Sequence, residues 1–399
     1  MPENLTDRNR CHKCDKTGKR KKDKLSKCER CHAITYCSRE CQVEDWPRHK
    51  ENCVPVMVTE VEEKGRGLVA ARDIKMGEEI LIDNTVVSLE IPDRSLTWPL
   101  TPTIARSLKQ QIEALPEEEV KQFYNLKTAD NIVFSERDLK IARRENCLKE
   151  LKIFRSNKVQ DDNKELLFFN FALINHSCSP NAEHCLKLNE GEDQKIVERK
   201  FELRAIKDIS KGEEITMFYL QWVLPTYMKH KRLRRLKDGF GFDCKCKVCL
   251  DNVDQDRILE NIFKILGSSN NAAENREFEQ VFVYGTSKKY HFTPDEWRMA
   301  AVKVGVALTL SLDLHIGKVR LKIVFCHNAV FAAQMARDPV LRDKAMATWK
   351  DLVMKTGFER RIEEFKETEE LVAKWSPEFK SKVPPTKDEI DCFDKLNDF

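Results

Sequence analysis

The chain has 399 residues, which is enough for two or three domains, and its 70 basic side chains nearly balance its 66 acidic ones. This balance excludes the strong overall field of a typical nucleic-acid or membrane binder. No apolar run approaches the roughly 20 residues that cross a bilayer, and the polar start MPENLTDRNR predicts no signal peptide. We expect a soluble intracellular protein that does not associate with membranes.

Residues 1–53 contain few large aliphatic side chains and many Cys, His and Lys, so metal is expected to replace a hydrophobic core there. Structural zinc takes four thiolate or imidazole ligands, and this segment offers eight. The odd total of 15 cysteines and their tight clusters favour zinc in a reducing compartment over a secreted disulfide framework. Spacing alone leaves the pairing open among Cys11-x2-Cys14, Cys28-x2-Cys31, Cys37-x3-Cys41 and His49-x3-Cys53.

The segment DKTGKRKKDKLSK separates the first two of these ligand pairs and is rich in lysine. Such a segment can contact nucleic acid or an acidic partner, although composition favours a solvated surface loop. Its stretch KTGKRKKDK also fits a basic nuclear import patch. We expect the protein in the cytoplasm and the nucleus.

The chain then alternates between strand-like and helical character. VMVTEV, GLVAA and EEILIDNTVVSL read as strands, with turns at Lys64–Gly67 and Met76–Gly77. Residues 103–155 have helical spacing and many charges. The cluster NFALINHSCSPNAEHC follows, and strand-like QKIVERKFELRAIKDI and EEITMFYL come next. A basic helix over 226–238 is predicted to lead into CKCKVC.

Beyond Asp251 the chain is predicted to be almost wholly helical, without a fixed-period repeat. The stretches EWRMAAVKVGVALTLSL, KVRLKIVFCHNAVFAAQMA and MATWKDLVMKTGFERRIEEF each have helical character. We expect a bundle that buries the apolar stripe Val302, Val304, Ala307 and Leu308, and a loosely packed tail after Pro384. Cys147, Cys326 and Cys392 are expected to be ordinary buried or surface thiols, and His184 and Cys185 to serve strand packing.

The N-terminal segment resembles the MYND finger, whose ligands interleave in a cross-brace. Tyr36 and Trp46 lie where that family often carries an aromatic residue, whereas the lysine-rich insertion is longer than the family pattern. MYND fingers usually bind proteins, often proline-rich segments, so the resemblance implies such a partner. It also implies one zinc held by Cys11, Cys14, Cys37 and Cys41, and another held by Cys28, Cys31, His49 and Cys53.

The stretch from Lys64 to Cys249 resembles a SET domain, and the whole chain is similar to the SET-and-MYND (SMYD) lysine methyltransferases. The pieces KGRGLVAARDIKMGEEIL, FRSN, NHSCSPN, KGEEITMFYL and FDCKCKVC occur in the family's order. Unlike in many relatives, the finger precedes the SET strands. The resemblance implies an α+β multidomain chain: 1–53 MYND-type zinc finger, 54–90 first part of the SET domain, 91–155 helical SET insertion, 156–222 core SET, 223–250 post-SET zinc segment and 251–399 helical C-terminal domain.

The resemblance implies methyl transfer from S-adenosyl-L-methionine to a lysine amine of a histone or another protein. The enzyme must align donor and acceptor, exclude water and receive a neutral amine, although an ordinary lysine has a pKa of about 10.4. Tyr219 matches the family's catalytic tyrosine and Phe242 a residue that packs on adenine. The implied cofactor-binding set is Lys64, Arg66, Asn157, Asn175, His176, Tyr219 and Phe242.

Two further features follow from the resemblance. Phe240 stands where the family has a second channel tyrosine, and the missing hydroxyl is expected to change how many methyl groups fit or to lower activity outright. Cys178 is implied as the fourth ligand of a third zinc, because three thiolates leave one tetrahedral corner open. The other three ligands are Cys244, Cys246 and Cys249.

Two other functions remain open from the sequence. The first is an interaction scaffold, in which a MYND adaptor carries a degenerate SET fold, as Phe240 and the long finger insertion suggest. The second is a DNA-binding zinc protein, which rests on the lysine-rich segment alone. We expect a monomer whose C-terminal helices resemble the family's helical-repeat lobe.

Overall fold

The computed structural model describes residues 10–18, 25–31, 34–50, 53–91, 99–129, 132, 134–161, 163–190, 196–220, 228–250, 255–267, 294–312 and 319–375. The centre of the lysine-rich insertion and the tail with Pro384 and Cys392 lie outside these residues. The chain divides into two compact units. Met1–His176, Asn181–Met217 and Arg235–Asp243 form the first unit; Ser177–Pro180, Phe218–Arg234 and Cys244–Phe399 form the second.

The first unit begins with a small lobe built around cysteines. The two-residue strands β1 (Ser26–Lys27) and β2 (Thr35–Tyr36) pair antiparallel and precede helix α1 (Arg39–His49). The helix begins at Ser38, whose hydroxyl accepts a hydrogen bond from the Cys41 backbone N–H at 3.3 Å, a favourable N-cap. The buried core of the lobe consists of Cys11, Cys28, Cys31, Ile34, Tyr36 and Ala71.

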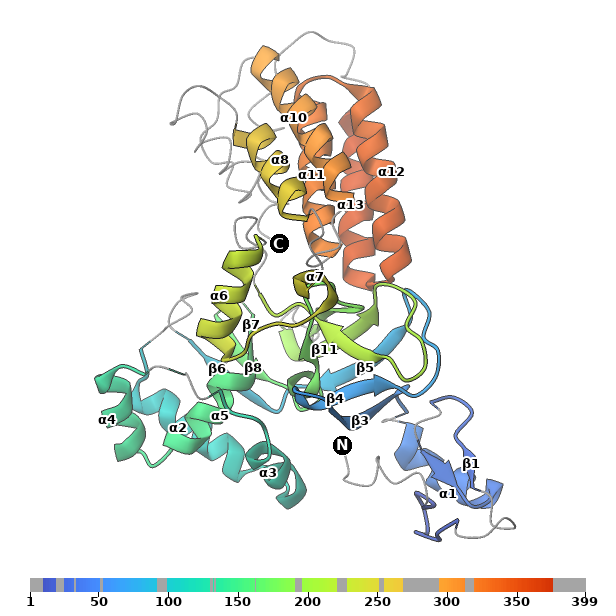
Figure 1. The fold of residues 1–399 in the computed structure, drawn as a ribbon, viewed down its shortest axis with the longest axis vertical. Coiled ribbons are helices and arrows are strands. Elements are labelled where there is room, and N and C mark those ends of the chain that lie inside the picture. The colour runs from blue at the N-terminus through green and yellow to red at the C-terminus, as the bar shows by residue number, and fades with distance from the viewer. Residues whose placement is uncertain are drawn as a thin grey trace. The chain divides into compact units, whose positions relative to one another are not determined.

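Three small sheets follow in the same unit (Figure 1). The first has the order β3 (Val56–Val61), β4 (Gly65–Ala70), β12 (Glu214–Met217) and β9 (Asn175–His176). The second has the order β10 (Ala182–Glu190), β11 (Ile196–Ala205) and β5 (Glu79–Asn84). The third has the order β6 (Val87–Glu90), β8 (Lys164–Leu167) and β7 (Lys158–Asp161). Of the pairs assigned among these strands, only β9 with β12 is parallel.

The turn predicted at Lys64–Gly67 lies slightly earlier in the structure. Glu62 to Lys64 make the turn, and Gly65 and Gly67 already belong to β4. Glu63 and Gly65 both have positive φ, 61° and 79°, so the left-handed residues needed to reverse the chain stand at the turn itself and directly after it.

Residues 102–157 form the predicted helices: α2 (Pro102–Glu113), α3 (Glu117–Tyr124), α4 (Glu136–Arg144) and α5 (Leu148–Asn157). Thr101 and Ser135 cap α2 and α4 through their hydroxyls. The helices bury Leu108, Phe123 and Phe154 in a core that also includes Leu89 and Leu167 of the third sheet. Packing against that sheet therefore supplies the stability that such short helices lack alone.

The described part of the second unit is mainly helical, as expected. Its helices are α7 (Lys247–Leu250), α8 (Gln255–Gly267), α10 (Pro294–Leu312), α11 (Val319–Met335), α12 (Pro339–Thr356) and α13 (Glu359–Trp375). The basic helix is α6 (Lys229–Phe240), whose residues divide between the two units. The mixed architecture confirms the predicted α+β class. Within the described ranges, no helix combines the length and apolar character needed to span a membrane.

One detail of the helical prediction was wrong. Val304 and Ala307 of the predicted stripe are fully buried, but Val302 is 60% exposed. Two positions on a helix separate side chains by about 200°, so Val302 and Val304 cannot share one face. The stretch MATWKDLVMKTGFERRIEEF is helical as predicted and belongs to two helices, because Gly357 ends α12 with a φ of 69° and donates its N–H to the Val353 carbonyl.

Asp83 at the end of β5 supports the turn that leads into the NHSC stretch. Its Oδ2 accepts hydrogen bonds from the backbone N–H groups of Asn170 at 2.6 Å and Phe171 at 3.0 Å, and Oδ1 accepts from Asn170 Nδ2 at 3.1 Å. The 3₁₀ turn η3 (Phe171–Leu173) starts there and β9 follows. Burial raises the pKa of Asp83 to about 6, although these three donors act in the opposite direction.

This raised pKa predicts a pH dependence of stability. Unfolded Asp titrates near 3.9, so the stabilisation from the proton held in the folded state is complete below that pH and is lost as the pH rises through about 6. From about pH 5 to pH 7, wild type should lose roughly 1 kcal/mol of unfolding free energy relative to Asp83→Asn. Urea denaturation at a series of pH values measures this difference. A constant difference would show that Asp83 does not titrate in this range.

Candidate functional site

Three clusters of Cys and His side chains have the geometry of tetrahedral metal sites. In each cluster the four ligand atoms lie within 4.8 Å of one another. A tetrahedron with Zn–S bonds of about 2.3 Å has an edge of about 3.8 Å. The observed separations match that edge: Cys14 to Cys37 is 3.6 Å, Cys31 Sγ to His49 Nε2 is 3.6 Å and Cys178 to Cys249 is 3.5 Å. The clusters are Cys11, Cys14, Cys37 and Cys41; Cys28, Cys31, His49 and Cys53; and Cys178, Cys244, Cys246 and Cys249.

This grouping agrees with the cross-brace that the family resemblance implies for the finger. The third cluster lies wholly in the second unit and joins Cys178 to the three cysteines near α7. Burial lowers the pKa of His49 to about 4, which keeps its imidazole neutral and therefore able to bind a metal. Two of the donor sets consist of four cysteine thiols, and the remaining set consists of three cysteine thiols and one imidazole. All three sets suit zinc.

A polar network between the two finger clusters was not found from the sequence. Buried Asp45 on α1 accepts hydrogen bonds from Tyr36 Oη at 2.8 Å and Arg48 Nε at 2.9 Å, and its Oδ2 lies 2.7 Å from His12 Nδ1. Burial acts to raise the pKa of Asp45, but these partners outweigh it and the pKa is lowered. Because His12 follows Cys11 and Tyr36 precedes Cys37, Asp45 connects α1 to residues beside the metal ligands of the first cluster.

Lys64, Arg66 and Asn175 meet where β4 approaches β9. Asn175 Nδ2 donates to the Arg66 carbonyl at 3.3 Å and to Glu214 Oε1 at 2.9 Å, and Lys64 Nζ lies 2.5 Å from Glu214 Oε2. A Cβ added to Gly67 would lie 2.7 Å from Asn175 Nδ2, so only glycine allows this approach. A Cβ at Gly65 would meet nothing within 4 Å, which leaves space beside the turn.

Asn157 and Arg66 donate hydrogen bonds to the segment 125–127, which contains none of the predicted motifs. Asn157 Nδ2 donates to the carbonyl of Lys127 at 2.9 Å, and the Arg66 guanidinium donates to the carbonyl of Asn125. Ser156 Oγ also accepts from the Ala129 backbone N–H at 3.0 Å. The chain after α3 is therefore attached to two predicted cofactor-binding residues. No sequence motif marks this segment, because it takes part mainly through backbone carbonyls, which every residue type carries.

The aromatic residues predicted near the cofactor divide between the two units. In the first unit the rings of His176 and Phe242 lie 5.9 Å apart, and those of Phe240 and Phe242 lie 6.5 Å apart. Phe240 is the last residue of α6 and is 37% exposed. Tyr219 is half-buried and follows β12 by two residues, in the second unit.

Asn181, the last residue of NHSCSPN, fastens this motif to β12. Its Nδ2 donates to Glu213 Oε1 at 2.9 Å and to the Glu214 carbonyl at 2.8 Å, and its Oδ1 accepts from the Thr216 N–H at 2.8 Å. Asn181 was not among the site residues predicted from the sequence. Asn and Asp near a tight turn often bond to backbone groups, which is the signal that could have identified it.

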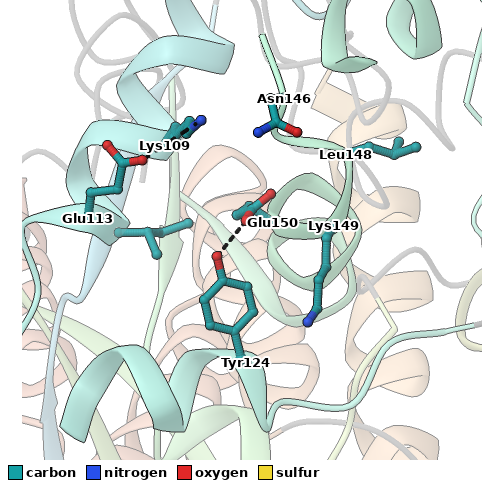
Figure 2. Close-up of a pocket in the computed structure, with 8 residues that line it drawn as sticks. Lys109, Glu113, Tyr124, Asn146, Leu148, Lys149 and Glu150 are labelled. Atoms are coloured by element: carbon teal, nitrogen blue, oxygen red, sulfur yellow. Dashed lines mark hydrogen bonds and ion pairs between the residues drawn. The ribbon is translucent and has the colours of Figure 1, made fainter. Parts of the chain in front are cut away.

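A cavity of about 450 Å³ lies in the helical insertion, away from these residues (Figure 2). Figure 2 shows the Tyr124 hydroxyl directed at Glu150, to which it donates at 2.5 Å. Lys149 lies 4.6 Å from the centre of the Tyr124 ring, and Lys109 lies 3.8 Å from Glu113. The charged side chains that line the cavity therefore contact other residues of the lining. None of the predicted site residues lines the cavity.

The close approach at Gly67 predicts the effect of small substitutions. Gly67→Ala should force Asn175 away from β4 and lower the free energy of unfolding by about 1–3 kcal/mol, as overpacking does. Gly65→Ala serves as the control, because it introduces only left-handed strain of roughly 1–2 kcal/mol in open space. Chemical denaturation measures stability, and the Asn175 side-chain amide resonances report its displacement. Unmoved Asn175 resonances in Gly67→Ala would contradict the contact.

Comparison with known proteins agrees with this geometry. A SET domain model matches residues 65–220, and a MYND finger model matches residues 11–53. The human N-lysine methyltransferase SMYD2 is 27% identical over 242 residues, which cover 59% of this chain and 50% of the human protein. SMYD2-A of Danio rerio is 27% identical over 293 residues, 67% of this chain and 58% of that protein. The chain thus spans about half the length of the curated relatives it matches.

Among solved structures, the SET domain of LSMT bound to lysine and AdoHcy is similar at 15% identity and a TM-score of 0.34. The match covers 88% of this chain and 95% of that one, but a likeness of this strength carries no functional argument. The two domain matches, the curated relatives and the three ligand clusters point the same way. The chain therefore contains a SET domain and a MYND finger, and it is similar to members of the SET and MYND domain-containing (SMYD) family.

Proposed function

We propose that this chain is an S-adenosylmethionine-dependent protein-lysine N-methyltransferase that acts on histone or other protein lysines. The observation that carries the proposal is the meeting of Lys64, Arg66 and Asn175 at the Gly65–Gly67 stretch of β4. Two motifs far apart in the chain, KGRG and NHSC, meet at this place, and Glu214 of a third motif bonds to both. Gly65 of the first motif leaves open space. The similarity to relatives that are N-lysine methyltransferases supports the same reaction class.

The residues present fit the cofactor. Lys64 and Arg66 would serve its carboxylate, Asn157, Asn175 and His176 would line its site, and Phe242 would pack on its adenine. Opposite charge and hydrogen-bond donors suit a carboxylate, and an aromatic face suits a purine. When bound, S-adenosylmethionine supplies an activated methyl group on a sulfonium.

The chain's own residues prepare the target lysine. Its amine must be neutral before it reacts, and an apolar surrounding favours the neutral form of an amine. Tyr219 would orient the amine through its hydroxyl and hold it in line with the methyl donor. Phe240 offers no hydroxyl, so we propose that the degree of methylation depends on this position.

The finger and its neighbourhood are proposed to serve protein binding. On α1, Val43 is 63% exposed and Trp46 is 37% exposed, which provides an apolar contact surface of the kind that proline-rich segments use. We propose a monomer of the cytoplasm and nucleus. Contact with nucleic acid is a further proposal, supported by the lysine-rich insertion alone.

The catalytic role of Tyr219 is tested by Tyr219→Phe. Removing one hydroxyl should lower methyl transfer to lysines of a protein array by about 10²–10⁴-fold, the range for loss of a positioned catalytic group. Cofactor affinity should change little. Mass spectrometry of modified lysines and calorimetry of S-adenosylhomocysteine binding give the two readouts.

Two results would favour the rival function, an interaction scaffold with an inactive SET fold. These are absent transfer by wild type across the array and tight binding of a proline-rich peptide. The observation that favours this rival is Phe240, which has no hydroxyl where the family has a second channel tyrosine.

The three ligand clusters are proposed to hold three zinc ions. Metal analysis of the full chain should find three zinc ions per chain, and Cys178→Ser should retain two because one thiolate of the third site is gone. Cys185→Ser is the matched control, since Cys185 lies outside the clusters and should retain all three. Equal zinc content in the two variants would contradict the ligand assignment at Cys178.

A further inference from the structure

Glu214, the first residue of β12, joins two residues of the proposed cofactor site. Its Oε2 lies 2.5 Å from Lys64 Nζ, and its Oε1 accepts a hydrogen bond from Asn175 Nδ2 at 2.9 Å. The strand pairing causes this meeting, because Glu214 lies opposite Val69 on β4 and Thr216 lies opposite Asn175 on β9. Neither composition nor the family motifs identified Glu214 as a binding residue.

The Glu214 carboxylate is held in one orientation. Asn175 Nδ2 also donates to the Arg66 carbonyl at 3.3 Å, so the amide is fixed between β4 and Glu214. The side chain of Glu214 is 18% exposed and that of Lys64 is 40% exposed. The hydrogen bond from Asn175 therefore fixes the Glu214 carboxylate, while both side chains of the ion pair remain partly exposed to solvent.

Stability alone does not account for this arrangement. An ion pair that is open to solvent contributes only about 0–1 kcal/mol to folding. Instead, a cation and an anion lie side by side and stay partly exposed to solvent. Gly65, the chain neighbour of Lys64, leaves open space, because an added Cβ would meet nothing within 4 Å. An amino acid tail carries the same two charges, an ammonium and a carboxylate on one carbon. If the carboxylate of the tail faced Lys64 and its ammonium faced Glu214, the four charges would alternate in sign.

We propose that Glu214 is a specificity-determining residue that binds the α-ammonium group of the cofactor's amino acid tail, while Lys64 binds its α-carboxylate. This inference rests on the proposed function, because it assumes a cofactor with such a tail. Asn175 then has a positioning role: its amide keeps the Glu214 carboxylate turned toward the ammonium. The pair of charges selects nucleosides that carry a zwitterionic tail over those that lack it.

The test compares two ligands that share their adenosine and thioether parts. S-adenosylhomocysteine carries the zwitterionic tail, and 5′-methylthioadenosine lacks it. Glu214→Gln preserves the shape and the acceptor for Asn175 but removes the charge. Calorimetry on the full chain should show about tenfold weaker binding of S-adenosylhomocysteine, because a hydrogen bond to a charged group is lost. Binding of 5′-methylthioadenosine should stay within about twofold.

Asp208→Asn is the matched control for removal of one acidic charge. Asp208 pairs with Lys75 at 2.8 Å, and both side chains are more than half exposed. Its substitution should leave the affinity for both ligands unchanged. A measurement on wild type needs no variant: the deaminated analogue of S-adenosylhomocysteine should bind about tenfold more weakly than the parent compound.

Three outcomes would overturn the role of Glu214. Tighter binding of S-adenosylhomocysteine by Glu214→Gln would show that the carboxylate only masks Lys64. Equal weakening of the binding of both ligands by Glu214→Gln would show that the carboxylate only shapes the site. Equal affinity of wild type for S-adenosylhomocysteine and its deaminated analogue would show that no group binds the ammonium. Failure of the proposed function is distinct: wild type would then bind neither ligand, or would bind S-adenosylhomocysteine and methylate nothing.

Discussion

The parallel pairing of β9 with β12 is the constraint on which the site depends. It places Asn175 beside Thr216 and His176 beside Met217, so a motif near residue 175 and another near residue 215 become neighbours. The two-residue strand β9 cannot hold this register through its own few hydrogen bonds. Asn181 supplies what is missing, because its side chain bonds to Glu213, to the Glu214 carbonyl and to the Thr216 N–H. Asp83 does the same from the other end by fixing the turn before β9.

Clusters of Cys and His side chains that can bind metal stand in for apolar packing where the chain is poorest in large side chains. Cys11, Cys28 and Cys31 are almost fully buried in a lobe whose other buried members are few. Clustered thiols without a metal would leave weakly hydrogen-bonding groups in the interior, whereas a tetrahedral ion satisfies four of them at once. The Asp45 network then links α1 to residues next to those ligands, so the metal sites and the helix stabilise each other.

The glycines of β4 join the sheet to the proposed binding function in two different ways. Gly65 provides a backbone angle that other residues adopt only with strain, and Gly67 provides room for Asn175. This distinction matters for Glu214, since its carboxylate reaches Asn175 and Lys64 only while β4 and β9 stay this close. The proposed ligand site is thus a consequence of strand packing and not of one continuous motif.

Local patterns in the sequence predicted the helices of the insertion and the finger's eight candidate ligands, because periodicity and ligand spacing act over a few residues. The α+β class was implied by the family resemblance. The local patterns failed where distant segments meet. Val302 was assigned to the wrong face, the Gly-x-Gly turn was placed slightly late, and Glu214, Asn181 and the carbonyls of Asn125 and Lys127 were not found. Each depends on which strand or loop lies opposite, and only the tertiary structure decides that, since the pairing partner is many residues away. The sequence alone therefore named the ligands and motifs, whereas the fold decided which charges face one another.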